Sequence, residues 1–153
     1  MRPVRADNRA VSESHVDAVR RAANLFSVDD AEAWAACVTE LFSPDAEWHS
    51  ALATRVHRGH DGICEWHRLL ADGFVDASTE LHHIEQHGDR VLTLHRFRGV
   101  FAATGAVIER RTGVVWEFEN ERCQRATSYV DWAEARAAAS APGASAGSTR
   151  ALD

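Results

Sequence analysis

Lysine is absent from this sequence, and all 17 basic residues are arginine. The protein therefore has no amine for Schiff-base catalysis and no phosphate-loop lysine. Cysteine is scarce, and the three present, Cys37, Cys64 and Cys123, lie far apart in apolar-patterned segments. This spacing contains no close metal-binding motif. We expect buried free thiols in a reducing compartment.

Long apolar runs are missing as well. No stretch approaches the ~18 apolar residues of a membrane-spanning helix. The early arginines Arg2, Arg5 and Arg9 are not followed by the apolar core of a secretory signal. These features predict a cytoplasmic protein without a membrane partner. The formal net charge of -6 argues against a nucleic-acid partner, because phosphate binding favours a basic surface.

The composition predicts one folded domain with a flexible segment at each end. The chain has 153 residues, 45% of them hydrophobic, which is enough for one domain with a real core. Residues 1–10 are polar and aperiodic, which predicts a flexible N-terminus. From Ser140 the chain is rich in alanine, serine and glycine, so we expect a disordered tail over residues 140–153. The domain should span residues 11–139.

Helical periodicity dominates the first half of this domain. Apolar stripes after Ser14, over Ala31–Leu41 and over Asp61–Ala71 predict three helices. Between the second and third helices, Glu47–Leu52 has the pattern of a short strand, and Ala53–His57 is expected to be a loop.

Strand periodicity dominates the second half. Val91–Phe101, Ala106–Phe118 and Arg122–Asp131 alternate with period two, and part of a further strand begins at Glu80. Trp132–Ala139 follows as a short closing helix or a frayed end. Helices on one face of a mostly antiparallel sheet define an α+β fold. We expect a curved sheet wrapped around three helices, with a conical cavity at its open end.

Several motifs resemble the nuclear transport factor two-like, or ketosteroid isomerase-like, superfamily. Leu41–Trp48 is similar to its helix-to-strand junction, and Arg58–Ile63 to its glycine-led third helix. His87–Val91 is similar to its central hairpin, and Tyr129–Asp131 to its final strand. The resemblance covers roughly residues 11–135 and is closest to the SnoaL-like polyketide cyclase branch. It implies a cystatin-like α+β barrel that holds a small molecule, and we expect no cofactor.

Two polar residues lie on the inward faces of the central strands. His95 is a candidate acid or base, and the alternative is a core histidine bonded to Thr93 or to a carbonyl. Arg110 would hold an enolate, phenolate or carboxylate, although a bulge would turn Arg111 inward instead. The sequence predicts His95 and Arg110 as the catalytic pair. In this pair, like-charge repulsion from the guanidinium would keep the imidazole neutral.

Other residues are expected to bind the substrate through an aromatic lining and through groups that orient its oxygens. These residues are Trp48, His49, Ser50, Phe97, Thr112, Trp116 and Ser128. By resemblance, Ser50 occupies the place of the carboxylate base of ketosteroid isomerases. Ser128 or Thr127 stands where cyclases and epoxide hydrolases carry an aspartate. The chain therefore lacks both carboxylates. The nine histidines form no known zinc spacing, so we expect surface or loop histidines and no metal.

The resemblance and the candidate pair favour an enzyme of the polyketide cyclase or ketosteroid isomerase type. It would perform aldol-type cyclisation or isomerisation on an apolar, ring-containing metabolite. The alternatives are a non-catalytic small-ligand-binding protein of the same fold and an epoxide hydrolase-like hydrolase. We also expect a homodimer through the outer face of the sheet, where charges of both signs alternate with Leu92 and Leu94.

Overall fold

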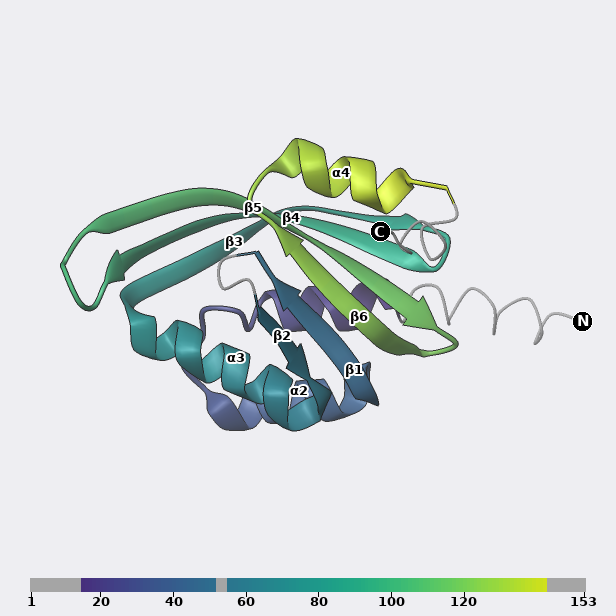
Figure 1. Ribbon diagram of the computed structural model, residues 1–153, viewed down its shortest axis with the longest axis horizontal. Coiled ribbons are helices and arrows are strands. Elements are labelled where there is room, and N and C mark those ends of the chain that lie inside the picture. The colour runs from purple at the N-terminus through teal and green to yellow at the C-terminus, as the bar shows by residue number, and fades with distance from the viewer. Residues whose placement is uncertain (1–14, 52–54, 143–153) are drawn as a thin grey trace, which may run out of the picture.

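Six strands form one curved, unclosed sheet with helices on both faces (Figure 1). The computed structural model describes residues 15–51 and 55–142. The N-terminus expected to be flexible, residues 1–10, lies outside the described residues, as do residues 143–153 of the tail expected over residues 140–153, whereas Ser140 is helical. Along the chain, a helical stretch at residues 15–23 is followed by α2 (Ala31–Leu41), β1 (Phe42–Ser50), β2 (Arg55–Arg58), α3 (Gly59–Gly73), β3 (Phe74–His87), β4 (Arg90–Phe101), β5 (Val107–Glu119), β6 (Arg122–Tyr129) and α4 (Trp132–Ser140). The α+β fold with a mostly antiparallel sheet is confirmed.

The strand order is β2-β1-β6-β5-β4-β3. Every neighbouring pair is antiparallel except β1 and β6, which run parallel. We call the face covered by α2 and α3 the inner face, and the face covered by α4 the outer face (Figure 1). In the described part of the chain, no helix is both long and apolar enough to cross a bilayer.

Strands occupy more of the chain than the sequence pattern indicates. β1 begins at Phe42 and contains Pro44, which is tolerated because the pairing with β6 shifts register between Phe42 and Glu47. The expected loop at Ala53–His57 is wrong in part, because Arg55–Arg58 pairs with β1 as strand β2. β3 begins at Phe74 rather than Glu80. It is an edge strand with little buried surface, which explains its weak apolar signal.

The main core lies between the inner face and the helices. Asp30 caps α2 by accepting a hydrogen bond from the amide of Ala33 at 3.0 Å, and α2 then buries Trp34 and Val38. These side chains pack with Trp48 and with other aromatic residues of the inner face. All three cysteines are free thiols, and Cys123 is the buried one, while Cys37 and Cys64 are half-buried.

Helix α4 forms a second core on the outer face. The sequence left open whether residues 132–139 form a short helix or a frayed end, and the structure shows a helix. It covers Leu92, Leu94 and Val115. The indole Nε1 of Trp132 donates to the carbonyl oxygens of His95 at 3.0 Å and Thr112 at 3.1 Å. At the opposite end of α4, a β4 guanidinium donates to the last helical carbonyls. Arg90 Nη1 lies 2.9 Å from the oxygen of Ala138 and 2.8 Å from that of Ala139.

The position of α4 changes the surface expected to form a homodimer. Leu92, Leu94 and Val115 of the outer face are already buried under α4, whereas Val107 is 56% exposed. Charged residues beyond α4 stay exposed, including Arg96, Arg111 and the pair Arg98 and Glu109, whose Nε and Oε2 atoms are 3.0 Å apart. A two-fold contact would therefore use these charges together with Val107, and the homodimer stays a prediction.

Candidate ligand-binding cavity

The inner face and α3 enclose a cavity of about 390 Å³. This volume lies in the range of ~300–1,000 Å³ that is typical of sites for small organic ligands. The residues that line it are Phe26, Trp48, Ser50, Ala51, Trp66, Leu70, Phe74, Thr79, Phe97, Phe101, Ile108, Arg110, Thr112, Val114, Ser128, Tyr129 and Val130. The lining is mostly aromatic and aliphatic.

Exposure distinguishes the mouth of the cavity from its depth. Phe101 and Val130 are 41% and 48% exposed, so they lie at the mouth. Trp48 and Val114 are 1% and 2% exposed, so they lie at the closed end. A ligand that fills the cavity would therefore place one end against buried aromatic rings and the other near solvent.

Arg110 is the charged residue of the described lining, and it lies at the exposed end. The pairing of β4 with β5 is regular here, with Phe97 opposite Arg110 and Arg96 opposite Arg111. Arg111 is on the outer face, with its guanidinium 5.1 Å from the ring centre of Trp132. The strand has no bulge that would exchange the two arginines. Among the described residues Arg110 has no carboxylate partner, which leaves its guanidinium available to an anion.

Ser128 lines the cavity but is held by the neighbouring strand. Its Oγ accepts a hydrogen bond from the amide of Ala51 at 2.7 Å and donates to the carbonyl of His49 at 3.4 Å. The hydroxyl therefore fastens β6 to the end of β1. Ser50 and Thr112 border the cavity as the sequence analysis expects.

His95 lies beneath the cavity wall rather than on its surface. It is 0% exposed, and its Nε2 is 2.8 Å from Thr93 Oγ1, which also accepts a hydrogen bond from Trp116 Nε1 at 2.9 Å. The ring of Phe26, which lines the cavity, packs against the imidazole with ring centres 5.1 Å apart. The Nδ1 atom is buried without a partner among the described residues. Trp116 is also absent from the described lining.

Burial lowers the pKa of His95 to about 4. The cause is loss of solvation of the charged imidazole, not repulsion from Arg110 as the sequence analysis expects. The expected neutral state at pH 7 follows from this pKa, but the physical reason is different.

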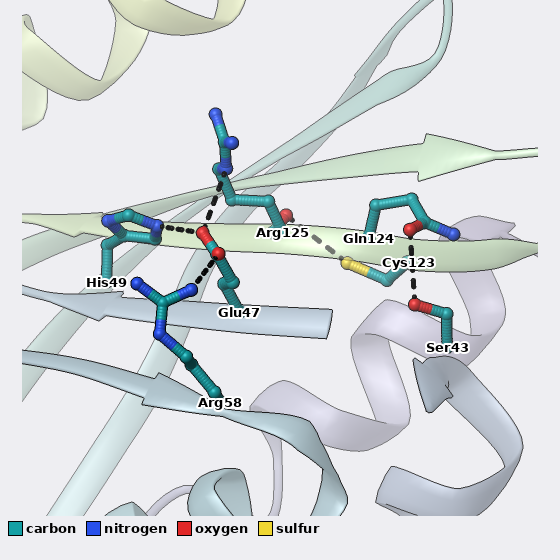
Figure 2. Close-up of polar contacts among 7 residues, drawn as sticks. All are labelled: Ser43, Glu47, His49, Arg58, Cys123, Gln124 and Arg125. Carbon is teal, nitrogen blue, oxygen red and sulfur yellow. Dashed lines mark hydrogen bonds and ion pairs between the residues drawn. The ribbon is translucent and has the colours of Figure 1, made fainter. Parts of the chain in front are cut away.

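His49 is not among the residues that line the cavity, and its ring points toward the carboxylate of Glu47 (Figure 2). With Arg58 and Arg125 it surrounds the carboxylate of Glu47, and its Nε2 is 2.8 Å from Glu47 Oε1. The hydrogen bond from His49, aided by the two guanidinium groups, lowers the pKa of Glu47. Glu47 and His49 share a face of β1, and Trp48 and Ser50 share the other, because side chains alternate along a strand.

Histidines are more buried than the sequence analysis expects. His57 and His67 are each 3% exposed, and His67 Nε2 lies 2.9 Å from the carbonyl of Leu25. Within the described residues no cluster of histidine, cysteine and acidic side chains is arranged to hold a metal ion. His57 and His67 therefore contribute to the packing of the fold.

Among the lining residues that were not predicted from the sequence are Phe26, Phe74, Thr79 and Phe101. Phe74 and Thr79 belong to the part of β3 that lies before its expected start. Thr79 is opposite Phe97, so extending the alternation one residue upstream of Glu80 would have found it. Phe26 follows the first helical stretch, and no local signal shows which strand it meets.

Comparisons with known proteins agree with this fold. The SnoaL-like domain family matches residues 19–126. No protein with a curated description matches the sequence. The structure is similar to that of a SnoaL-like protein from Jannaschia sp. CCS1, with a TM-score of 0.66 and 17% identity over 85% of this chain and 94% of that chain. It is similar to Bal32a from a soil-derived mobile gene cassette, with a TM-score of 0.67 and 23% identity over 78% and 90%.

A third similar structure is TerC, crystallised with polyporic acid, with a TM-score of 0.63 and 16% identity over 79% of this chain and 94% of that chain. At these identities the structures establish the fold alone. The family match is stronger evidence, because residues 19–126 are more than half of the 153-residue chain and contain most of the sheet and the closed end of the cavity. This chain belongs to the SnoaL-like domain family.

Proposed function

We propose that this protein binds a flat, largely apolar, ring-containing molecule that carries an acidic or enolic oxygen. The observation that carries the proposal is the composition of the cavity wall. Aromatic and aliphatic side chains form most of it, and Arg110 supplies a cation at the mouth. Among the described lining residues there is no histidine, carboxylate or thiol. The wall therefore favours binding over acid–base catalysis.

Each part of the wall fits one part of such a ligand. Phe26, Trp48 and Trp66 present ring faces and edges, which pack well against a flat aromatic body. The guanidinium of Arg110 matches an anionic oxygen by a charge-assisted hydrogen bond. The relative TerC was crystallised with polyporic acid, which supports an organic acid as ligand.

A suitable probe for this site is 4′-isopropylbiphenyl-4-carboxylate, an apolar aromatic acid. Substituting Arg110 with glutamine should weaken its binding by roughly 5- to 10-fold. A hydrogen bond to a charged group contributes about 1.5–3 kcal/mol, and exposure at the mouth reduces this value. Isothermal titration calorimetry measures the change in Kd. The matched control is Arg111→Gln, because the adjacent side chain lies on the outer face. Equal losses in the two variants, or none in Arg110→Gln, would reject Arg110 as the anion site.

A second candidate function is proton transfer of the polyketide cyclase type, with His95 as the base. The supporting observation is the unpartnered Nδ1, separated from the cavity by Phe26. If the Phe26 ring rotates, a neutral imidazole would meet a carbon acid beside a carbonyl and take its proton. Arg110 would stabilise the resulting enolate.

This candidate predicts a measurable proton exchange. The wild-type protein should accelerate deuterium exchange at the carbons beside the carbonyl of 2-tetralone in D₂O, followed by NMR. His95→Gln should reduce the acceleration by at least about 100-fold, because general-base catalysis contributes ~10²- to 10⁴-fold. Exchange at the uncatalysed rate with the wild-type protein would leave ligand binding as the function.

A further inference from the structure

One indole at the closed end of the cavity lacks a hydrogen-bond acceptor. Three of the five tryptophans donate to acceptors within the fold: Trp34 to the carbonyl of Ile63, Trp116 to Thr93, and Trp132 to two carbonyls. Trp66 is half-buried. Trp48 is different, because it is 1% exposed and its Nε1 is buried without a partner among the described residues.

The surroundings of Trp48 contain rings rather than acceptors. Ring centres of Trp66, Phe26 and Trp116 lie 4.2, 5.7 and 5.7 Å from that of Trp48. A buried N–H without an acceptor is rare in folded proteins, and it destabilises the structure until an acceptor arrives. Trp48 itself lines the cavity, so an acceptor can approach from there, and it reaches the covered Nε1 once the neighbouring rings move apart.

We propose that Trp48 Nε1 donates a hydrogen bond to a carbonyl oxygen of the ligand and thereby selects for ligands with an acceptor at their buried end. This inference rests on the proposed binding function and adds a second polar anchor to it. Arg110 recognises the acidic end at the mouth, and Trp48 recognises the carbonyl end inside the cavity.

The sheet register sets how far apart these two anchors are. Trp48 is opposite Ala126, and Ala126 is opposite Trp116. Trp116 follows Arg110, which lies at the mouth, by six positions along β5. At about 3.3 Å per residue, this offset is roughly 20 Å between backbone positions. The two long side chains reach inward from both ends and shorten the gap. The ligand class is therefore an elongated, flat acid with a carbonyl at the end opposite its acid group.

Two probes that differ in one end group test this inference, because one has a carbonyl oxygen where the other has a methyl group and a hydrogen. They are 4′-acetylbiphenyl-4-carboxylate and 4′-isopropylbiphenyl-4-carboxylate, which share the carboxylate and nearly the same shape. The wild-type protein should bind the acetyl probe more tightly. Trp48→Phe keeps an aromatic ring and removes the N–H, so it should reduce this preference by roughly 3- to 10-fold, the effect of one neutral hydrogen bond. Calorimetric Kd values for both probes and both proteins give the ratio.

The outcomes separate the two proposals. If both probes bind and the preference is unchanged in Trp48→Phe, the indole meets only water, and this inference is wrong while the binding function stands. If neither probe binds to the wild-type protein, both proposals are rejected.

A second measurement covers the case in which Trp48→Phe does not fold. In ¹H–¹⁵N spectra of the wild-type protein, the acetyl probe should move one indole N–H resonance downfield, and the isopropyl probe should not. Identical shifts with both probes would overturn the inference.

Discussion

Replacing Gly113 with valine is expected to destabilise the protein by about 3–5 kcal/mol, measured by urea denaturation. Valine is favourable in a strand, so backbone propensity predicts no loss. The reason is space, because a Cβ at Gly113 would lie 2.5 Å from Ala135 Cβ and 3.2 Å from a methyl carbon of Leu94. Helix α4 must then move off the outer face, which exposes Leu92 and Val115.

Two control variants isolate this effect. Gly73 is the last residue of α3, and a Cβ there meets nothing within 4 Å, so Gly73→Ala should leave stability unchanged or raise it. The smaller change Gly113→Ala should be partly rescued by Ala135→Gly, which removes the opposing methyl group. If Gly113→Val unfolds at the wild-type urea concentration, the close approach of α4 to β5 is not a constraint.

Acidification from pH 7 to pH 4 should remove about 3 kcal/mol of stability through His95 alone. Burial places the pKa of this imidazole at about 4 in the folded protein, compared with 6.5 when it is solvated. Between these values the unfolded chain binds a proton that the folded protein does not. The contribution is therefore fully present above pH 6.5 and declines as the pH falls towards 4.

The variant His95→Gln provides the comparison, because glutamine does not titrate. Its free energy of unfolding should fall less between pH 6.5 and pH 5 than that of the wild-type protein. Within this window the lowered pKa of Glu47 contributes little, because most of its effect falls near and below the ordinary value of 4.5, and it acts equally in both proteins. His57 also has a lowered pKa from burial and acts in the same direction in both proteins. Parallel pH profiles for the two proteins would show that His95 is solvated.

Alternation along the strands is the part of the site that the sequence predicts well. Phe97, Arg110 and Thr112 all face the cavity, because residues on adjacent regular strands keep their faces over the whole ladder. The same rule explains the error at His49, since neighbouring Trp48 and Ser50 already occupied the inner face. Only one face of β1 can line the cavity, and that face carries Trp48 and Ser50.

Depth within the core is the part that strand pattern cannot predict. His95 has the inward orientation expected from the sequence, yet Phe26 covers it. Phe26 is separated from His95 by 69 positions, and their contact depends on how the first helical segment packs on the sheet. The period-two pattern predicts which face of the sheet a side chain lies on. Whether a ligand can reach that side chain depends on packing by residues that are distant in the sequence. The acid–base role assigned to His95 depends on this packing.

The position of strand β6 has a consequence for any shortened form of this protein. Although β6 is the last strand in the chain, it lies in the middle of the sheet between β1 and β5. A fragment that ends before Arg122 would divide the sheet into two unconnected pieces, β2-β1 and β5-β4-β3. The hydrogen bond from the amide of Ala51 to Ser128, across 77 positions of sequence, joins the two halves of the cavity wall. The cavity therefore depends on β6, and a fragment without this strand would lose the part of the wall that Ser128 and Tyr129 line.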